Sequence, residues 1–248
     1  MADPPSRGTA LVTGASSGIG AATIRALGAA GYATVAAARR LERCEEIARE
    51  VGGRALRLDV TDPESVSRLA GELDEVSVIV HSAGGALGLE PITETEEGQW
   101  RAMYESNVLG VVRVTKALLP ALRASGAGHV VILGSIAGVE AYEGGGGYTA
   151  AKHAVHAMAK TLRLELLADG IRVTEVAPGL VETEFSLVRF AGDERRAAEV
   201  YRGIEPLRGE DVADLIAFVV TRPPHVDIDY VVVKPTAQAT ATVVHRRD

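Results

Sequence analysis

The sequence predicts one doubly wound α/β domain spanning residues 1–248, with a seven-stranded parallel sheet flanked by helices. Short apolar runs alternate with longer amphipathic runs along the whole chain. A glycine-rich loop joins the first apolar run to the first amphipathic run. The chain has 248 residues, 47% of them hydrophobic, which suffices for one large core. We find no internal repeat and no linker that would divide it.

Composition narrows the expected partners and compartment. The formal net charge of −7 argues against nucleic acid or an anionic membrane as a partner. The first residues lack the apolar core of a signal peptide, and no apolar run approaches the ~20 residues that a membrane span needs. A lone cysteine, Cys44, cannot form an internal disulfide. We therefore expect a cytoplasmic protein that acts on a small molecule.

The first strand, 9–13, runs into the loop Gly14-Ala-Ser-Ser-Gly18-Ile-Gly20, and a helix follows over 21–30. The free N–H groups and positive dipole end of such a helix bind a pyrophosphate. Glycine loops also make plain turns. The strand before this loop and the helix after it favour the first half of a dinucleotide-binding unit of the Rossmann type.

The second strand, 32–38, ends in Arg39-Arg40, where an NAD-specific enzyme would place an acid for the ribose 2′-hydroxyl. Two guanidiniums at this place suit the 2′-phosphate of NADP. The alternative is that the two arginines are solvated residues at the start of the next helix. The third strand, 54–58, leads to Asp59-Val60, placed to contact an adenine. Asp59 could instead cap the next helix, although Asp62-Pro63 suits that role better.

The fourth strand, 76–80, leads to His81-Ser-Ala-Gly-Gly85, where small residues let the backbone approach a cofactor ribose. A long amphipathic helix is predicted from Gly98 to about Ser125. Asn107 lies within the apolar half of this helix. Its side chain is either a functional group or an amide whose hydrogen bonds are satisfied in the core.

The fifth strand, 129–133, delivers the hydroxyl of Ser135 at its carboxyl end, where parallel sheets bind ligands. The next helix begins near Tyr148 and places Lys152 on the same face. An ammonium about 4 Å from a phenol contributes roughly 4 kcal/mol at an effective dielectric of about 20, enough to lower the phenol pKa by about three units. The pattern predicts an acid–base pair, although Tyr-x-x-x-Lys also arises by chance on helices.

The remaining chain supplies a sixth strand over 171–177, a helix over about 210–220 and a final strand over 228–233. The polar segment 181–203 follows a strand's carboxyl end and is predicted to be a substrate lid. Residues 235–248 are expected to be loosely ordered unless they dock on another subunit. No metal is expected, since His153 and His156 lack a third ligand and are best interpreted as surface histidines.

Together these motifs resemble the short-chain dehydrogenase/reductase family over essentially the whole chain. The resemblance implies that Tyr148 is the general acid/base and that Lys152 lowers its pKa and holds the nicotinamide ribose. Ser135 would position the substrate, and Asn107 would support a proton relay. His81-Ser82 replaces the usual Asn-Asn, so we expect altered local hydrogen bonding with catalysis retained. The residues expected to bind NADP are Gly14, Ser16, Ser17, Gly18, Ile19, Gly20, Arg39, Arg40, Asp59, Val60, Ser82, Ala83, Gly84, Asn107, Tyr148, Lys152, Pro178, Gly179, Val181 and Thr183.

A narrower resemblance, over 86–91, 178–186, 188–190, 192–193 and 224–228, is to NADP-dependent 3-hydroxy acid dehydrogenases. It implies substrates such as serine, allo-threonine or 3-hydroxyisobutyrate, and a homotetramer. Glu143 and the glycines at 144–147 depart from that pattern. Arg189 is a candidate cation for a substrate carboxylate, with a surface arginine as the alternative. A carbonyl reductase for a bulkier ketone and a non-catalytic NADP-binding sensor remain the competing functions, and the intact Ser135, Tyr148 and Lys152 weigh against the sensor.

Overall fold

The computed structural model describes residues 7–247, and within that range seven strands form one parallel sheet. The strand order is β3-β2-β1-β4-β5-β6-β7, as predicted for a doubly wound domain. The order reverses between β1 and β4, and at such a point the carboxyl ends of the strands leave a crevice for ligands. The strands are β1 (Thr9–Thr13), β2 (Ala33–Ala38), β3 (Arg54–Arg57), β4 (Val78–His81), β5 (His129–Leu133), β6 (Arg172–Pro178) and β7 (Tyr230–Val233).

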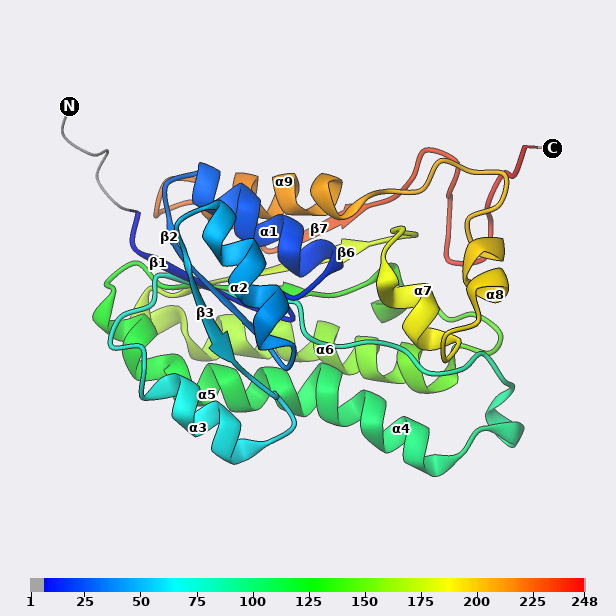
Figure 1. The fold of residues 1–248 in the computed structure, drawn as a ribbon, viewed down its shortest axis with the longest axis horizontal. Coiled ribbons are helices and arrows are strands. Elements are labelled where there is room, and N and C mark those ends of the chain that lie inside the picture. The colour runs from blue at the N-terminus through cyan, green and yellow to red at the C-terminus, as the bar shows by residue number, and fades with distance from the viewer. Residues whose placement is uncertain (1–6, 248) are drawn as a thin grey trace.

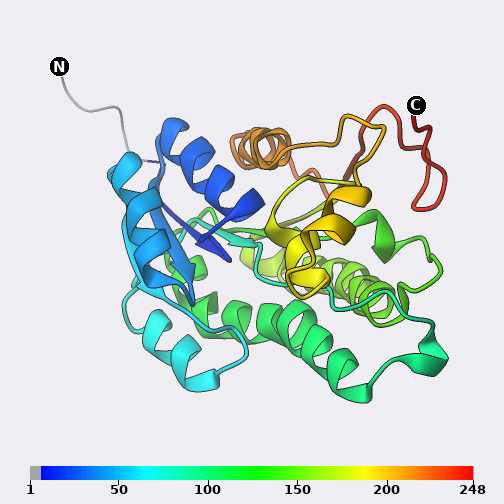
Figure 2. The ribbon, with the colours of Figure 1, turned by 45° about the vertical axis from the view of Figure 1, so that its right-hand side comes forward.

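Helices cover both faces of the sheet (Figures 1 and 2). On one side lie α1 (Gly18–Ala29), α2 (Leu41–Glu50) and α9 (Gly209–Val220). On the other lie α3 (Pro63–Ala70), α4 (Glu97–Tyr104), α5 (Gly110–Ala124) and α6 (Gly146–Glu165). Side chains of a strand point alternately to the two faces. In β1, Leu11 therefore joins the apolar cluster with α5 and α6, while Ala10 and Val12 join the cluster with α1 and α9.

The predicted helix 98–125 is interrupted by a π-helical turn, Glu105–Leu109, between α4 and α5. Helix α3 begins as predicted, with the Asp62 side chain accepting a hydrogen bond of 2.9 Å from Glu64 N and Pro63 in the first turn. Short 3-10 turns lie at Ile92–Glu94, Ile136–Gly138 and Leu167–Asp169.

The segment 181–203 contains two short helices, α7 (Glu184–Arg189) and α8 (Glu194–Glu199), beyond the carboxyl end of β6. The C-terminal segment does not fit the prediction of a loose tail, because up to residue 247 it folds back on its own chain. The Gln238 side chain is 5% exposed and accepts a hydrogen bond of 2.8 Å from Leu180 N. Arg247 N donates to Gly203 O at 2.8 Å, so the tail lies against the lid segment.

Across residues 7–247, no helix is both long enough and apolar enough to cross a membrane. The expectation about the very first residues concerns 1–6, outside the described range.

Candidate active site

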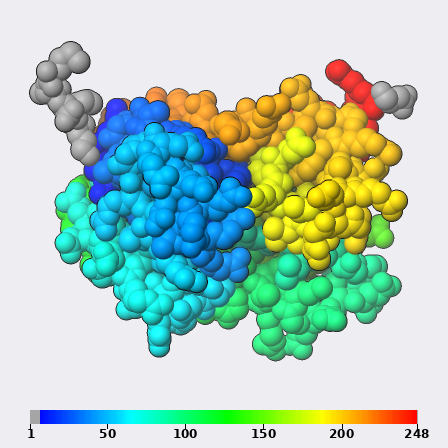
Figure 3. Space-filling view, viewed as in Figure 1, coloured from blue at the N-terminus to red at the C-terminus, as the bar shows by residue number. Residues whose placement is uncertain are grey.

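A cavity of about 1080 Å³ lies at the carboxyl edge of the sheet. It is lined by the ends of β1, β2, β4, β5 and β6 together with α7 and the tail. Every residue predicted to contact the cofactor or to take part in catalysis lines this one cavity. In the space-filling view, the yellow residues of α7 lie at the surface beside the blue residues of α1 and α2 (Figure 3).

The glycine loop after β1 packs directly on the end of β4. Gly14 has φ of +66°, and a Cβ there would lie 2.8 Å from Ala83 Cα, so only glycine fits. Ser17 stands at the N-cap of α1, and among the described residues its side chain makes no capping hydrogen bond. The first N–H groups of α1 therefore remain available to an anion in the cavity.

Arg40 lies over this loop at the end of β2. Its Nε donates to Ser16 Oγ at 3.2 Å and its Nη2 donates to Ser17 Oγ at 2.8 Å. It also forms an ion pair of 2.9 Å with Glu184 on the lid helix α7, and both side chains are about half exposed. The Arg40 guanidinium holds the pKa of the Glu184 carboxyl below its ordinary value. Arg40 is thus already fixed where the cavity meets the end of β2.

At the end of β3, the Asp59 side chain folds onto its own turn. Its Oδ1 accepts from Thr61 N at 2.9 Å and from Thr61 Oγ1 at 2.7 Å. Since Asp62 caps α3, Asp59 does not serve that helix. Asp59 and Val60 both reach the cavity.

His81, which replaces the usual asparagine, lies buried at the end of β4. The ring is 3% exposed, and its Nε2 lies 2.9 Å from Thr115 Oγ1 on α5. Burial lowers the pKa of His81 to about 3, so the imidazole is neutral at physiological pH. Ser82 N and Ala83 N donate to Thr13 Oγ1 at 3.2 and 3.1 Å, which joins this segment to β1.

Asn107 lies in the π-helical turn, a feature frequently found at functional sites. Its Nδ2 donates to Met103 O at 2.8 Å and to Gly85 O at 2.9 Å, and Gly85 N donates to its Oδ1 at 3.3 Å. The amide is therefore satisfied and also borders the cavity, so the two interpretations of Asn107 are compatible.

Ser135, Tyr148 and Lys152 all line this cavity. Lys152 Nζ donates to Leu133 O at 2.8 Å and lies 5.7 Å from the centroid of the Tyr148 ring. Burial lowers the pKa of Lys152 to about 8. Burial also raises the pKa of Tyr148, and a hydrogen bond with Ser135 and the nearby Arg189 only partly oppose that effect. The predicted depression of the Tyr148 pKa by Lys152 is therefore not seen, because desolvation of the phenol dominates.

Arg189 reaches this site from the lid helix. Its Nε donates to Gly88 O at 2.8 Å and its Nη1 donates to Tyr142 Oη at 3.1 Å. The guanidinium carbon lies 6.0 Å from the centroid of the Tyr148 ring. Phe185 packs on the same ring with centroids 5.6 Å apart. Arg189 is not a surface arginine but a cation beside the candidate acid/base.

The model of the short chain dehydrogenase family matches residues 8–193, three quarters of the chain. The chain belongs to the short-chain dehydrogenase family. It is an oxidoreductase of that family, as the motifs predicted.

Relatives of this short-chain dehydrogenase cover nearly its whole length. An uncharacterized oxidoreductase of Mycobacterium tuberculosis is 54% identical over 94% of this chain and 93% of its own. Sulfoacetaldehyde reductase 2 of Chromohalobacter salexigens is 41% identical, covering 96% and 98%. The NADP-dependent 3-hydroxy acid dehydrogenase of Schizosaccharomyces pombe is 40% identical, covering 96% of each. The solved closed form of a serine dehydrogenase complexed with NADP⁺ superposes with a TM-score of 0.91 at 35% identity, covering 97% and 100%.

Two parts of the cavity were not predicted from the sequence. Tyr142 stands in an irregular stretch between Ser135 and α6, where no periodicity marks it, yet its hydroxyl accepts from Arg189. Gln238 and Ala241 belong to the C-terminal segment, which was predicted to be loosely ordered. The unexpected glycines at 146 and 147 start α6 against Trp100 of α4, where a Cβ at either position would lie 3.0 to 3.3 Å from the indole.

Proposed function

We propose that this short-chain dehydrogenase transfers hydride between NADP(H) and a small acidic substrate. In this substrate, one carbon separates the reacting carbon from the acid group. The 3-hydroxy acids serine, allo-threonine and 3-hydroxyisobutyrate have this arrangement. The observation that carries the proposal is Arg189, a guanidinium 6.0 Å from the Tyr148 ring. Arginine binds carboxylates through charge-assisted hydrogen bonds.

NADP fits the chemistry of the cavity. The end of β2 offers Arg39 and Arg40 to a 2′-phosphate, with Arg40 held by two serine hydroxyls. The loop 14–20 would hold the pyrophosphate, Asp59 and Val60 the adenine, and 82–84 with Lys152 the nicotinamide ribose. Pro178, Gly179, Val181 and Thr183 would border the nicotinamide. The names of the relatives and the NADP⁺ complex of the structural neighbour support this cofactor. When bound, NADP(H) supplies or accepts the hydride.

The chain's own residues would manage the proton. In reduction, the Tyr148 phenol would donate its proton to the substrate oxygen, and in oxidation it would take that proton back. The Ser135 hydroxyl, hydrogen-bonded to Tyr148, would hold the same oxygen. The Lys152 ammonium would stabilise the phenolate that forms during reduction. Asn107, hydrogen-bonded to the backbone at residue 85, would keep the π-helical turn in place at the cavity and support the proton relay.

A sulfonate substrate is the second candidate, favoured by the 41% identical relative named as a sulfoacetaldehyde reductase. In sulfoacetaldehyde the carbonyl also lies one carbon from the acid group, and a guanidinium binds sulfonate oxygens as it binds carboxylate oxygens. With either substrate, Arg189 would therefore bind the acid group.

A substrate panel tests the proposal. L-serine, L-allo-threonine and 3-hydroxyisobutyrate are offered with NADP⁺, sulfoacetaldehyde with NADPH, and neutral secondary alcohols with NADP⁺, while the absorbance of the reduced cofactor is followed. We expect turnover with at least one acidic substrate and much less with neutral alcohols of the same length. Turnover of bulky neutral alcohols alone would favour a carbonyl reductase. Tight NADP binding without any turnover would favour a sensor.

A homotetramer and a cytoplasmic location complete the proposal, the first resting on the narrower resemblance and the second on composition. Light scattering on the purified protein measures the oligomeric state directly.

A further inference from the structure

A buried carboxylate lies next to the candidate site, on strand β6. Glu175 is 2% exposed. Its Oε2 is 2.6 Å from His156 Nδ1, whereas its Oε1 has no hydrogen-bond partner among residues 7–247. The expectation of a surface histidine is thus wrong for His156, because it pairs with a buried acid. A buried carboxylate is costly unless an opposite charge compensates it.

The carboxylate lies directly against the segment that ends in Ser135. A Cβ on Gly134 would lie 2.9 Å from both Cγ and Cδ of Glu175, so the side chain at 134 must be absent. Gly134 follows Leu133, whose carbonyl accepts the hydrogen bond from Lys152 Nζ. Gly134 N in turn donates to Val176 O at 2.8 Å, which fixes this segment next to the backbone of Glu175.

Lys152 and His156 stand on successive turns of α6 and share one face. His156 contacts Glu175 directly, so Lys152 lies one turn further along the same face toward the cavity. The negative charge of Glu175 raises the pKa of Lys152 and opposes the lowering caused by burial. The ammonium and the carboxylate therefore stabilise each other across the end of β5.

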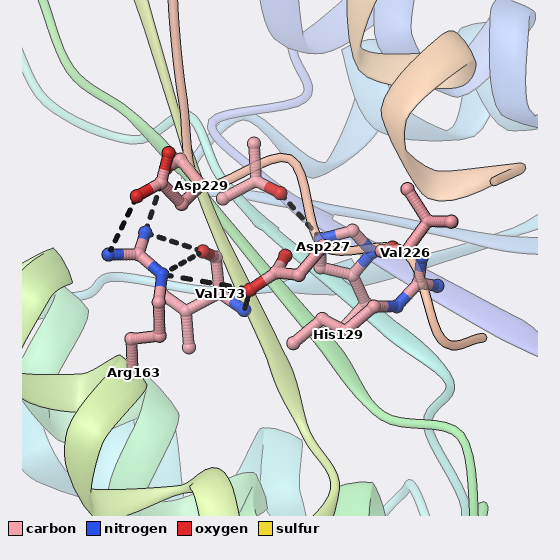
Figure 4. A network of polar contacts seen from close by, with 8 residues as sticks. His129, Arg163, Val173, Val226, Asp227 and Asp229 are labelled. Carbon is pink, nitrogen blue, oxygen red and sulfur yellow. Dashed lines mark hydrogen bonds and ion pairs between the residues drawn. The ribbon is translucent and has the colours of Figure 1, made fainter. Parts of the chain in front are cut away.

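The other charged groups near Glu175 are engaged elsewhere or lie at the surface. A second cavity of about 380 Å³ is bordered by Glu175 and His156 and also by Lys160, Arg163, Asp229 and Tyr230. Figure 4 shows Arg163 directed at Val173, Asp227 and Asp229. Its Nη2 donates to Val173 O at 2.7 Å and to Asp229 O at 2.8 Å, and it forms ion pairs of 3.6 and 3.8 Å with the two aspartates.

Neither Lys160 nor Tyr230, which also border this cavity, supplies a buried cation to Glu175. Lys160 is exposed on α6. The Tyr230 ring packs edge-on against His156 with centroids 5.0 Å apart. Glu140 acts on Tyr230, as Glu175 does, by raising its pKa, although burial is the larger cause. Besides His156, which contacts the carboxylate directly, Lys152 is the buried basic group on which the charge of Glu175 acts.

We propose that Glu175, held by His156, is a positioning residue whose carboxylate keeps the buried Lys152 ammonium charged and directed at the site. The inference rests on the proposed role of Lys152 in the reaction. It adds a support that lies outside the cavity of the candidate site.

Glu175→Gln tests this inference because it removes the charge and keeps the shape. The rate of NADPH oxidation with sulfoacetaldehyde or 3-oxopropanoate, whichever the unmodified enzyme reduces faster, is measured from pH 6 to pH 10. An opposite charge shifts a neighbour's pKa by roughly one to three units. We expect the alkaline limb of the pH profile, where Lys152 loses its proton, to move to lower pH by about one unit or more. Glu175→Asp should restore most of the original profile.

Asp229→Asn is the matched control, since Asp229 borders the same small cavity but pairs with Arg163, and its profile should not move. If Glu175→Gln fails to fold, His156→Leu provides the second variant. It removes the donor that holds the carboxylate, and it should move the limb in the same direction by a smaller amount.

An unchanged profile in a folded Glu175→Gln or His156→Leu enzyme would overturn the inference, as would a rate loss equal at every pH. Lys152→Met separates this failure from that of the proposed function. Loss of turnover in Lys152→Met with a normal Glu175→Gln profile would reject only the role of Glu175. Normal turnover in Lys152→Met would reject the proposed mechanism itself.

Discussion

At the residue scale, two environments act in opposite directions on Tyr148. Its ring is partly exposed to the cavity, yet protein surrounds the phenol closely enough that burial raises its pKa. The hydrogen bond with Ser135 and the charge of Arg189 lower it by less. The protonated phenol is therefore the resting form at neutral pH, which suits the acid needed for reduction. Oxidation needs the phenolate, so its rate should rise with pH across the alkaline range.

Tyr148→Phe removes the proton that this step transfers and retains the packing against Phe185. Because general acid–base catalysis contributes about 10²–10⁴-fold, we expect turnover to fall at least that far. Fluorescence titration with NADPH should show binding close to that of the unmodified protein. A Phe variant with near-normal turnover would exclude Tyr148 as the acid/base.

Arg189→Leu tests the anion site on the lid. Hydrogen bonds to charged groups contribute roughly 1.5–3 kcal/mol, so we expect kcat/KM for an acidic substrate to fall about 10- to 100-fold. A neutral alcohol should be affected much less, and Arg189→Lys should recover part of the loss because it keeps the charge. An equal loss for acidic and neutral substrates would mean that Arg189 shapes the lid through Gly88 and Tyr142 and does not bind the acid group.

At the element scale, α7 is joined to the end of β2 by one ion pair. Glu184, the first residue of α7, holds the same guanidinium that would meet the 2′-phosphate. Both side chains are about half exposed, and such pairs contribute only about 0–1 kcal/mol. A phosphate carrying nearly two negative charges can therefore displace the Glu184 carboxylate from Arg40 when the cofactor binds.

This arrangement predicts opposite effects for the two partners. Glu184→Gln should strengthen NADP⁺ binding by up to about fivefold and leave NAD⁺ binding unchanged, because the competing charge is gone. Arg40→Ser should reduce the preference for NADP⁺ over NAD⁺ by at least about tenfold, and added salt should narrow the preference of the unmodified protein. Dissociation constants for both cofactors, measured at low and high salt, test both statements. Equal affinity for the two cofactors in the unmodified protein would contradict them.

The elements differ in how far the sequence could predict them. Strands β1, β2, β4 and β5 were predictable because their apolar runs are buried on both faces. The Asp62-Pro63 pair located the start of α3, because it supplies the N-cap and the first-turn proline. The π-helical turn was not, since one extra residue at Asn107 leaves the apolar periodicity of α4 and α5 almost unchanged. The tail was not predictable either, because its order depends on contacts made by Gln238 and Arg247 with distant backbone atoms. Tyr148 and Lys152 were found by spacing, whereas the effect of burial on their pKa values required the surrounding protein.

At the scale of the whole molecule, two histidines in the sheet core make the stability of the fold depend on pH. His81 on β4 is 3% exposed and His129 on β5 is fully buried. Their Nε2 atoms lie 2.9 and 2.7 Å from the hydroxyls of Thr115 and Thr174. Burial lowers the pKa of each to about 3, with Arg172 adding to the effect on His129. Both imidazoles are therefore neutral in the folded protein, on adjacent strands of the sheet.

Because these two histidines are buried in the neutral form, we expect the protein to lose stability in mild acid. An unfolded histidine takes up a proton near pH 6.5, while the buried one does not until about pH 3. The unfolded state thus binds more protons below pH 6.5, so stability is complete above that pH and falls as the pH drops. Each histidine should lower the free energy of unfolding by about 1.4 kcal/mol per pH unit in this window.

His81→Asn isolates one of the two contributions, because asparagine stays neutral throughout. Between pH 7 and pH 5, the unmodified protein should lose about 2 kcal/mol more unfolding free energy than His81→Asn, measured by urea titration at each pH. Any packing cost of the substitution is present at both pH values and cancels in this difference. His225→Asn, in an exposed loop, is the control and should match the unmodified protein. If His81→Asn loses as much stability as the control between the two pH values, then His81 does not remain neutral in the folded core at pH 5.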